Sequence, residues 1–575
     1  MTKITKEIWM KNWDSHVSEN LEYSRDSLGN LYSQGMARFP EKPACWMIER
    51  EISFGELLEN VQKFATFLQD NGLKKGDIVV INLPNSPQYL IAHFGTILAG
   101  GVASGLNLLL SEREIAYQLN DSRAKAIVTL DAIYDKHLRN ILNEIPRLEI
   151  IIATNVSDYM GLSKIKVFLG KMIGRIPRGK VSNWSDKTVV KFLDIMNNKR
   201  ANVREVDIDV KKDLALLQYT GGTTGFPKGT ELTHANIIAQ HTILEHWLQL
   251  KPGKPIILCA FPMFHLAGLA LAAQSIWLSG AQILIPDPRD IDYIIDEIIE
   301  KKPTHVVNVP TLYNLIMKNP KSSKIPREVL DNIDVYVSGA APFPTEMIRD
   351  FEKHMHAENK VMEVYGMTET SPVSVANPFL GKKKVGKVGL PLPDTEIKLI
   401  DLETNEPVET GIPGEILVRG PIVTRGYLNK PKATKATIEP DKWLHTGDVG
   451  IMDEDGYIKI VDRVKDMLNI SGYKVYSIHV EDILTKHSAI DLIAIIGIDD
   501  PNRPGSEIVK AFVKLKSGIE ATKKLKEEIK VYAQENLSKY EMPKQWEFRE
   551  ELPLTTIGKV LKKALRGEHT LWSDE

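Results

Sequence analysis

The spacing of apolar residues predicts alternating helices and buried strands over most of the chain. A helical apolar pattern covers 54–71, and the β-branched run 78–81 and a second apolar helix at 89–98 follow it. The same alternation returns at 293–300, 306–309 and 312–317. Strands that are apolar on both faces and separated by helices are typical of a mostly parallel sheet covered on both sides.

The pattern changes from about Gly386. Short expected strands at 388–391, 396–401 and 414–419 lie between Gly/Pro turns and indicate a small β subdomain. A small α+β unit follows the charged, turn-prone stretch Asp462–Asp466, with strands at 494–497 and 509–513 and a helix at 523–536. We therefore predict an α/β protein with an N-terminal domain at 1–462 and a C-terminal domain at 463–575.

Composition narrows the function classes. Of the 575 residues, 43% are hydrophobic. The 73 basic and 75 acidic residues give a net charge of −2, so the overall charge gives no sign of binding to nucleic acid. Cys45 and Cys259 lack disulfide or metal-ligand spacing, and we expect both to be buried fillers in a reducing cytoplasm. No secretory signal is expected from the N-terminus.

One uncharged segment, 255–286, needs comparison with a membrane span. Spanning takes about 20 continuous apolar residues. Pro262, His265, Gln274 and Gln282 interrupt the segment, and its ends read as strands around a helix. We interpret it as buried α/β core.

The stretch Tyr219–Gly229 carries the strongest chemical signal. It places three threonines, four glycines and Lys228 directly after the apolar run 214–217. Glycines allow backbone N–H groups to turn toward an anion, hydroxyls add donors, and the lysine adds charge, as a polyphosphate requires. Pro227 stands where a P-loop has its second glycine, so the loop suggests ATP while arguing against a P-loop kinase or GTPase.

Further motifs occur in a fixed order after this loop. They are Phe264-His265 with Gly268, Ser338-Gly339-Ala340-Ala341-Pro342, Tyr365-Gly366-Met367-Thr368-Glu369-Thr370, His445-Thr446-Gly447-Asp448, Asp462-Arg463-Val464-Lys465-Asp466 and Gly558-Lys559. Together with the loop, they resemble the adenylate-forming superfamily of acyl-CoA synthetases, luciferases and peptide-synthetase adenylation domains. The resemblance covers nearly the whole length.

The resemblance implies two mostly parallel, helix-covered sheets with a small β subdomain, and a mobile C-terminal domain. It also implies a reaction in two halves: a carboxylate attacks the α-phosphorus of ATP, and a thiol then captures the acyl-adenylate. An anion must approach an anion, so Mg²⁺ and fixed cations are expected. The implied ATP-loop residues are Tyr219, Thr220, Gly221, Gly222, Thr223, Thr224, Gly225 and Lys228, and the implied magnesium ligands are Thr224 and Glu369.

Other matching positions take nucleotide and CoA roles by the same resemblance. Tyr365 would stack on adenine, and Asp448 and Arg463 would contact the ribose. Lys465 would be the hinge, and Lys559 would bridge the substrate carboxylate and α-phosphate; Leu554 and Lys562 depart mildly from the family pattern there. The remaining expected nucleotide contacts are Gly339, Ala340, Ala341, Gly366, Met367 and Thr368, and those expected along the pantetheine channel are Gly472, Tyr473 and Lys474.

The acid is expected near His265, Gly268, Gly339 and Gly366. A tryptophan at the Gly366 position closes the pocket of similar acetyl-CoA synthetases, so glycine favours a longer chain, and Gly222 resembles long-chain fatty acid–CoA ligases. A fatty acid–CoA ligase for medium or long chains is therefore the leading hypothesis. Aryl or other carboxylate CoA ligases and an inactive adenylate-binding or fatty-acid transport protein are the alternatives; a peptide-synthetase module is disfavoured because the chain ends soon after Lys559.

A basic insert at 158–186 leaves two interpretations open. It includes Lys164, Lys166, Lys171, Arg175, Arg178 and Lys180 among apolar residues. It is either an exposed helix with a solvated face or a peripheral membrane contact that delivers fatty acid. Fatty acid, ATP and CoA are the expected small-molecule partners, and a homodimer is left open.

Overall fold

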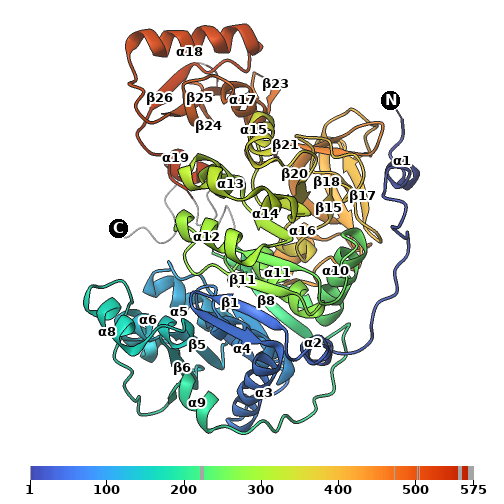
Figure 1. Cartoon of the computed structure of the whole chain (residues 1–575). Coiled ribbons are helices and arrows are strands. Elements are labelled where there is room, and N and C mark those ends of the chain that lie inside the picture. The colour runs from blue at the N-terminus through green and yellow to red at the C-terminus, as the bar shows by residue number, and fades with distance from the viewer. Residues whose placement is uncertain are drawn as a thin grey trace.

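The computed structural model describes residues 2–220, 226–471, 473–501, 503, 505–554 and 560–567. It confirms an α/β protein with a large N-terminal part and a smaller C-terminal part (Figure 1). The two large sheets are mostly parallel, with antiparallel strands at their edges.

The first large sheet, as described, has eight strands, and the connections between its parallel strands carry helices. Its order is β19 (Gly426–Tyr427), β9 (Lys228–Thr233), β8 (Leu214–Thr220), β4 (Val102–Gly105), β3 (Ile78–Asn82), β5 (Ala126–Leu130), β6 (Ile150–Thr154) and β7 (Thr188–Lys191). Val79 and Val80 of β3 point into different buried clusters, so both faces of this sheet are covered.

The second large sheet has nine strands in the described part of the chain. Its order is β16 (Leu390–Pro391), β15 (Val375–Ala376), β14 (Val361–Tyr365), β13 (Val335–Ser338), β12 (His305–Asn308), β10 (Ile256–Cys259), β11 (Ala281–Leu284), β1 (Pro43–Met47) and β2 (Arg50–Ser53). Ile283 and Leu284 again belong to two clusters, and the cluster of Leu284 also contains Val79 of the first sheet. The largest apolar core therefore lies between the two sheets.

The helices of the N-terminal part fill this core or cover the outer faces. Among them, α2, α3, α4 and α11 contribute side chains to the core between the sheets. Their bounds and those of the others are α1 (Lys6–Met10), α2 (Leu28–Ala37), α3 (Phe54–Asp70), α4 (Pro87–Leu98), α5 (Glu112–Asp121), α6 (Asp131–Ile133), α7 (Arg139–Ile141), α8 (Lys164–Met172), α9 (Phe192–Asn198), α10 (His234–Trp247), α11 (Leu266–Trp277), α12 (Ile291–Lys301), α13 (Pro310–Lys318), α14 (Arg327–Asp331), α15 (Thr345–Met355) and α16 (Pro431–Thr437).

The predicted β subdomain is an antiparallel sheet. Its order is β17 (Glu396–Ile400), β18 (Gly414–Arg419), β20 (Leu444–Met452) and β21 (Ile458–Arg463). Asp448 of β20 pairs in register with Arg463 of β21, which brings two distant sequence motifs together. The last strand ends at Arg463, and the domain boundary between 462 and 463 stays a prediction.

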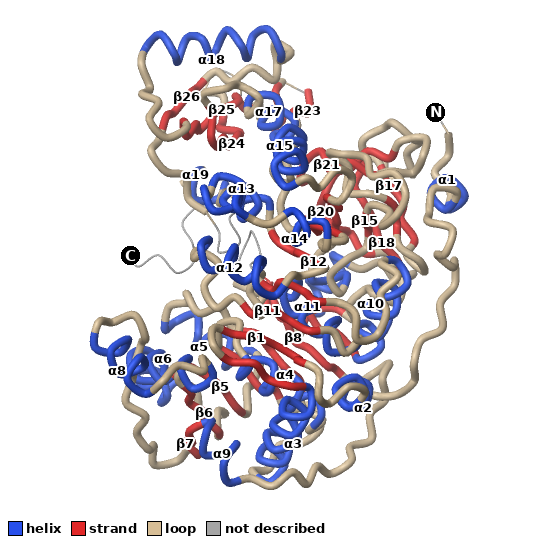
Figure 2. The backbone as a smooth tube through the Cα atoms, viewed as in Figure 1, coloured by secondary structure: helices blue, strands red, loops and turns tan. Residues whose placement is uncertain are grey.

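The C-terminal unit forms a separate group of strands with α18 on its outer side (Figure 2). Its elements are β22 (Leu468–Ile470), β23 (Tyr473–Val475), α17 (Ser477–Leu484), β24 (Ile490–Asp499), β25 (Glu507–Leu515), α18 (Lys523–Asn536), β26 (Gln545–Phe548) and α19 (Lys562–Leu565). An ion pair of 3.5 Å joins Lys318 of α13 to Asp491 of β24 across the two parts.

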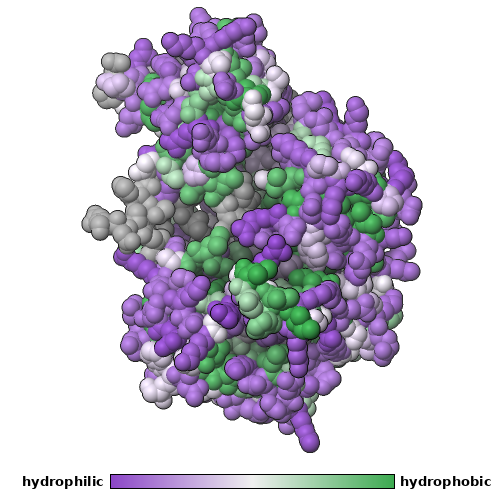
Figure 3. Space-filling model, turned by 60° about the vertical axis from the view of Figure 1, so that its left-hand side comes forward, coloured by the Kyte–Doolittle hydropathy of each residue, from purple (hydrophilic) through white to green (hydrophobic). Residues whose placement is uncertain are grey.

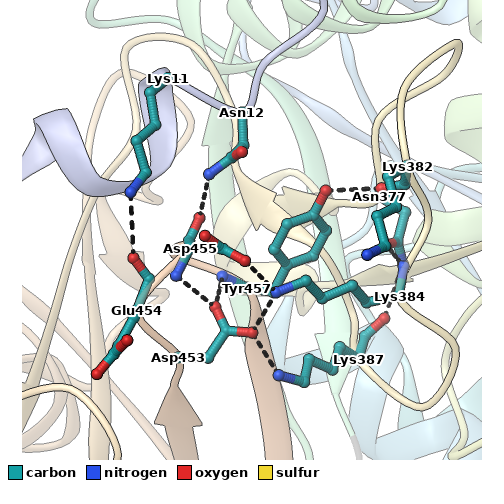
Figure 4. A network of polar contacts seen from close by, with 10 residues as sticks. All are labelled: Lys11, Asn12, Asn377, Lys382, Lys384, Lys387, Asp453, Glu454, Asp455 and Tyr457. Atoms are coloured by element: carbon teal, nitrogen blue, oxygen red, sulfur yellow. Dashed lines mark hydrogen bonds and ion pairs between the residues drawn. The ribbon is translucent and has the colours of Figure 1, made fainter.

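The N-terminal segment is fastened to the turn between β20 and β21 (Figure 4). The Asn12 amide donates to the Asp455 carbonyl at 2.8 Å, and Lys384 donates to the carboxylates of Asp453 and Asp455 at 2.7 and 2.8 Å. The same lysine lies over the Tyr457 ring, 4.4 Å from its centroid. The Asn12 bond ties the first residues to the β subdomain, and the Lys384 contacts hold the same turn from the other direction along the chain.

The uncharged segment 255–286 is buried core, as predicted, and forms β10, α11 and β11. Among helices in the described part of the chain, none combines the length and apolar character needed to cross a membrane. Cys45 and Cys259 are buried and unbonded, also as predicted.

Candidate active site

The Gly/Thr loop connects two hydrogen-bonded antiparallel strands. Thr220 at the end of β8 pairs with Lys228 at the start of β9, so the loop is the tip of a hairpin. Its residues 221–225, which include the predicted Gly221, Gly222, Thr223, Thr224 and Gly225, lie outside the described residues. Just before β9, the Tyr117 ring stacks on Phe226, and the Tyr117 hydroxyl donates a 3.0 Å hydrogen bond to the Pro227 carbonyl. The residue that departs from a P-loop therefore anchors the hairpin.

A buried carboxylate lies beside this hairpin. Glu369 is 5% exposed, and its Oε1 accepts a 2.8 Å hydrogen bond from the Tyr427 hydroxyl. The Nζ of Lys228 lies 5.1 Å from the centroid of the Tyr427 ring. Burial raises the pKa of Glu369, whereas Tyr427 and the cations Lys228 and Arg463 act to lower it. The group thus combines an anion and a cation at one point of the site.

Three strands supply a second polar cluster. The Tyr365 hydroxyl at the end of β14 donates to Oδ2 of Asp448 at 2.8 Å. The other oxygen of Asp448 pairs with Nε of Arg463 at 3.0 Å, and Asp448 is 6% exposed. The carboxylate is therefore fixed by a phenol and a guanidinium, with the register of β20 and β21 setting its place.

Lys465 follows this cluster at the predicted hinge. Burial and the neighbouring Arg463 guanidinium lower the pKa of Lys465 to about 8. A lysine with a lowered pKa in a cleft is a candidate functional group.

One cavity of about 550 Å³ connects these residues, a size typical of small-molecule sites. Its polar end contains Thr220, Lys228, Glu369, Arg463 and Lys465. The rest of the lining is mainly apolar and comes chiefly from α10, α11, β10, β12, β13 and β14. The apolar lining includes Leu244, Trp247, Leu248, Ile257, Leu271, Val307, Val337, Met362 and Val364.

The structure brings many of the sequence-predicted residues to this cavity. Those that line it are Thr220, Lys228, His265, Gly339, Ala340, Tyr365, Gly366, Met367, Thr368, Glu369, Arg463 and Lys465. Asp448 reaches it through Tyr365 and Arg463. Gly472 and Lys559 lie outside the described residues.

Five predicted residues are placed away from the cavity lining. Tyr219 turns its hydroxyl to Asp121, at 2.7 Å, and Ala341 follows the lining residue Ala340. In the C-terminal part, Tyr473 stacks on Tyr540 with ring centroids 5.0 Å apart, and Lys474 pairs with Glu403 at 2.9 Å. The fifth is Gly268 of α11.

Two glycines are required by close backbone contacts. A Cβ on Gly268 would lie 2.3 Å from the Pro262 carbonyl oxygen, so this glycine lets α11 pack on the preceding loop. A Cβ on Gly366 would lie 1.9 Å from the Pro372 carbonyl oxygen. Gly366 lines the cavity, and the fold itself excludes a side chain there.

Sequence reasoning missed several residues of the cavity. Tyr427 links Lys228 to Glu369, yet it lies in β19, almost 200 residues after the loop, with no motif around it. His305 and Asn308 of β12 also line the cavity; they are 7% and 1% exposed, and Nε2 of His305 and both amide atoms of Asn308 have no hydrogen-bond partner within the described residues. Only the fold reveals them.

Comparison with known proteins identifies the family. The model of the AMP-binding enzyme family matches residues 33–428, and that of the AMP-binding enzyme C-terminal domain matches 479–559. This chain belongs to the AMP-binding enzyme family.

Relatives of this AMP-binding enzyme share its whole length. A Bacillus subtilis (strain 168) protein named long-chain-fatty-acid–CoA ligase is 37% identical over 569 residues and covers 98% of both chains. An Escherichia coli O157:H7 protein of the same name is 34% identical, again over 98% of both chains. A 4-coumarate–CoA ligase of Arabidopsis thaliana is 30% identical over 90% of this chain and 86% of its own.

The fold of the AMP-binding enzyme also matches solved structures. ATP-bound MatB from Rhodopseudomonas palustris has a TM-score of 0.79 and 27% identity, covering 94% of this chain and 98% of its own. A benzoate CoA ligase from Burkholderia xenovorans has a TM-score of 0.79 at 22% identity, covering 94% and 100%, and shows the likeness of fold.

Proposed function

We propose that the protein is an AMP-forming fatty acid–CoA ligase for medium or long chains. The observation that carries the proposal is a cavity whose lining combines cations and a carboxylate with a mainly apolar remainder. A fatty acid has the same division, a charged head and an apolar tail. Full-length similarity to proteins named long-chain-fatty-acid–CoA ligase supports this substrate class.

In the first half-reaction, the acid carboxylate attacks the α-phosphorus of ATP, and pyrophosphate leaves. Lys228 and the Gly/Thr loop hold the β- and γ-phosphates, and Lys559 bridges the acid and the α-phosphate. Asp448 accepts hydrogen bonds from the ribose hydroxyls, a role that carboxylates often have in nucleotide sites. Its bonds to Tyr365 and Arg463 support this role because they fix its orientation before ATP binds.

Glu369, together with Thr224, is the magnesium ligand in this proposal. A buried carboxylate among cationic groups, with one oxygen oriented by Tyr427, fits a hard divalent ion. No group of three His, Cys, Asp or Glu side chains placed to hold a metal occurs in the described residues, so Glu369 and Thr224 are the residues that would hold the ion. A magnesium ion held there would supply positive charge against the phosphates.

In the second half-reaction, the CoA thiol attacks the acyl carbonyl, and AMP leaves. The C-terminal domain, 463–575, turns about Lys465 relative to domain 1–462 and brings Gly472, Tyr473 and Lys474 to the pantetheine channel. The position of Tyr473 and Lys474 outside the cavity supports the need for such a movement.

The experiment that tests the function is ATP–pyrophosphate exchange with saturated acids from C8 to C18 and with benzoate and 4-coumarate. Exchange with the fatty acids, followed by acyl-CoA formation, is expected. Exchange with the aryl acids alone would select the aryl-ligase alternative, and none with any acid would favour the inactive binding protein.

A further inference from the structure

Helix α8 occupies an unusual position in the fold. It belongs to the connection between β6 and β7, which are adjacent parallel strands. A helix in such a crossover ordinarily buries its apolar side on the sheet. None of the residues of α8 is buried. In Figure 1 the helix projects from the side of the N-terminal part, far from the C-terminal unit.

The apolar side of α8 faces solvent. Ile165, Phe168, Leu169, Met172 and Ile173 are 51–73% exposed. Their spacing of three and four residues places them on one stripe of the helix. Figure 3 turns this side of the molecule forward and shows hydrophobic side chains gathered among hydrophilic ones. The stripe is therefore not the solvated polar face that an ordinary surface helix presents.

The protein body holds this helix in place. A Cβ on Gly170 would lie 2.7 Å from Ile176, which is buried in the main core, so the inner side of the helix packs closely. Beyond it, the Pro177 carbonyl accepts from the Asn155 amide at 2.8 Å, and the Lys180 N–H donates to Asp135 at 2.9 Å. The exposed stripe is thus presented by a fastened element.

The charged residues of the segment that carries the stripe are of one sign. From Gly161 to Lys180 the chain has six basic residues and no acidic residue. Lys166 pairs with Glu49 of the neighbouring turn at 2.5 Å. Two copies meeting through this helix would bring basic residues against basic residues, which opposes self-association. An anionic partner is complementary to the surface.

We propose that α8 is a membrane-surface anchor that inserts its apolar stripe into a bilayer containing anionic lipids. Exposed apolar side chains at helical spacing, flanked by basic residues, are what an interfacial helix requires. The inference extends the proposed ligase function, since a long-chain acid partitions into membranes. The contact itself does not depend on catalysis.

A site-specific probe tests the insertion. Because Cys45 and Cys259 are fully buried, Phe168→Cys in the native, full-length protein accepts an environment-sensitive thiol label at one site. We expect its fluorescence to shift to the blue on phosphatidylglycerol/phosphatidylcholine vesicles. Leu380→Cys, at a residue 60% exposed, is the control and should not shift. An unchanged label at 168, or a shift that requires protein concentration but no vesicles, would overturn the proposal.

Vesicle co-sedimentation measures the strength of binding. The double variant Ile165→Ser/Phe168→Ser should lower partitioning onto vesicles by about tenfold or more. On anionic vesicles, Lys164→Gln and Arg175→Gln should each lower partitioning by about fivefold. Leu380→Ser should bind like wild type, and equal binding by the stripe variant would contradict insertion. Octanoate activation should be unchanged in all variants; a wild type that activates no acid from C8 to C18 would refute the ligase function while leaving the vesicle result intact.

Discussion

The Tyr427 hydroxyl donates a 2.8 Å hydrogen bond to Oε1 of Glu369, and the same tyrosine ring lies 5.1 Å from Nζ of Lys228. A residue outside every recognisable motif thus joins two residues from motifs about 140 positions apart. This bond opposes the rise in pKa that burial imposes on Glu369.

Tyr427→Phe tests this relationship. Loss of a hydrogen bond to a charged group costs about 1.5–3 kcal/mol, so pyrophosphate exchange should fall by roughly tenfold to a hundredfold at neutral pH. The pKa of Glu369 should rise further, and activity should therefore recover as the pH increases. A pH profile of exchange measures both effects.

Tyr457→Phe is the matched control, because it loses a 2.6 Å bond to the Lys382 carbonyl in the β subdomain. Its exchange rate should stay close to wild type. A Tyr427→Phe enzyme with an unaltered rate and pH profile would show that the bond does not serve the site.

Two substitutions in the cluster of Asp448, Tyr365 and Arg463 should raise the KM for ATP to different extents. Asp448→Asn removes the charge that faces Arg463, whereas Tyr365→Phe removes only one hydrogen bond. We expect KM for ATP to rise by about tenfold or more in the first variant and by a few-fold in the second, about 1 kcal/mol. Equal effects in the two variants would mean that Asp448 acts only through Tyr365.

Gly366 should not tolerate a side chain. The Cβ of Gly366→Ala would lie 1.9 Å from the Pro372 carbonyl oxygen, so the backbone must shift, at a cost of about 1–3 kcal/mol. We expect a lower thermal unfolding midpoint together with weaker acid activation. Gly55→Ala in α3, where the nearest atom is the Pro40 carbonyl oxygen at 3.2 Å, should lower the midpoint much less than Gly366→Ala does. Wild-type stability of Gly366→Ala would contradict the role of the contact.

Local patterns were enough to predict most of the fold. The helix expected at 54–71 is α3, and the strand expected at 78–81 is β3, because apolar periodicity reports burial directly. The strand expected at 388–391 is shortened to β16, since Gly389 adopts a φ of +109°. Residues such as Tyr427 could not be predicted, because their place depends on pairing between distant strands.

In the candidate site, too, local motifs could be predicted from the sequence and long-range contacts could not. Residues in motifs, such as Glu369 and Arg463, line the cavity, and their roles stay predictions. The sequence could not show that the stripe on α8 faces outward, because helical spacing is the same for a buried and an exposed apolar side. Nor could it show that Gly366 is constrained by a carbonyl six residues ahead.

Glu363 on β14, two residues before Tyr365, predicts how stability depends on pH. It is 8% exposed, its Oε2 accepts from the Gly386 N–H at 2.9 Å, and burial raises its pKa to about 8. Between about pH 4.5 and 8 the folded state holds a proton that the unfolded state has lost, so stability falls as the pH rises through this window. Glu363→Gln keeps an acceptor and removes the titration. Its free energy of unfolding should vary less over the window, with about 1.4 kcal/mol at stake for each unit of pKa shift, and should exceed that of wild type above pH 8. Glu454→Gln, at an exposed carboxylate, is the control and should follow wild type, and a Glu363→Gln protein with the wild-type pH dependence would show that this carboxyl does not carry the effect.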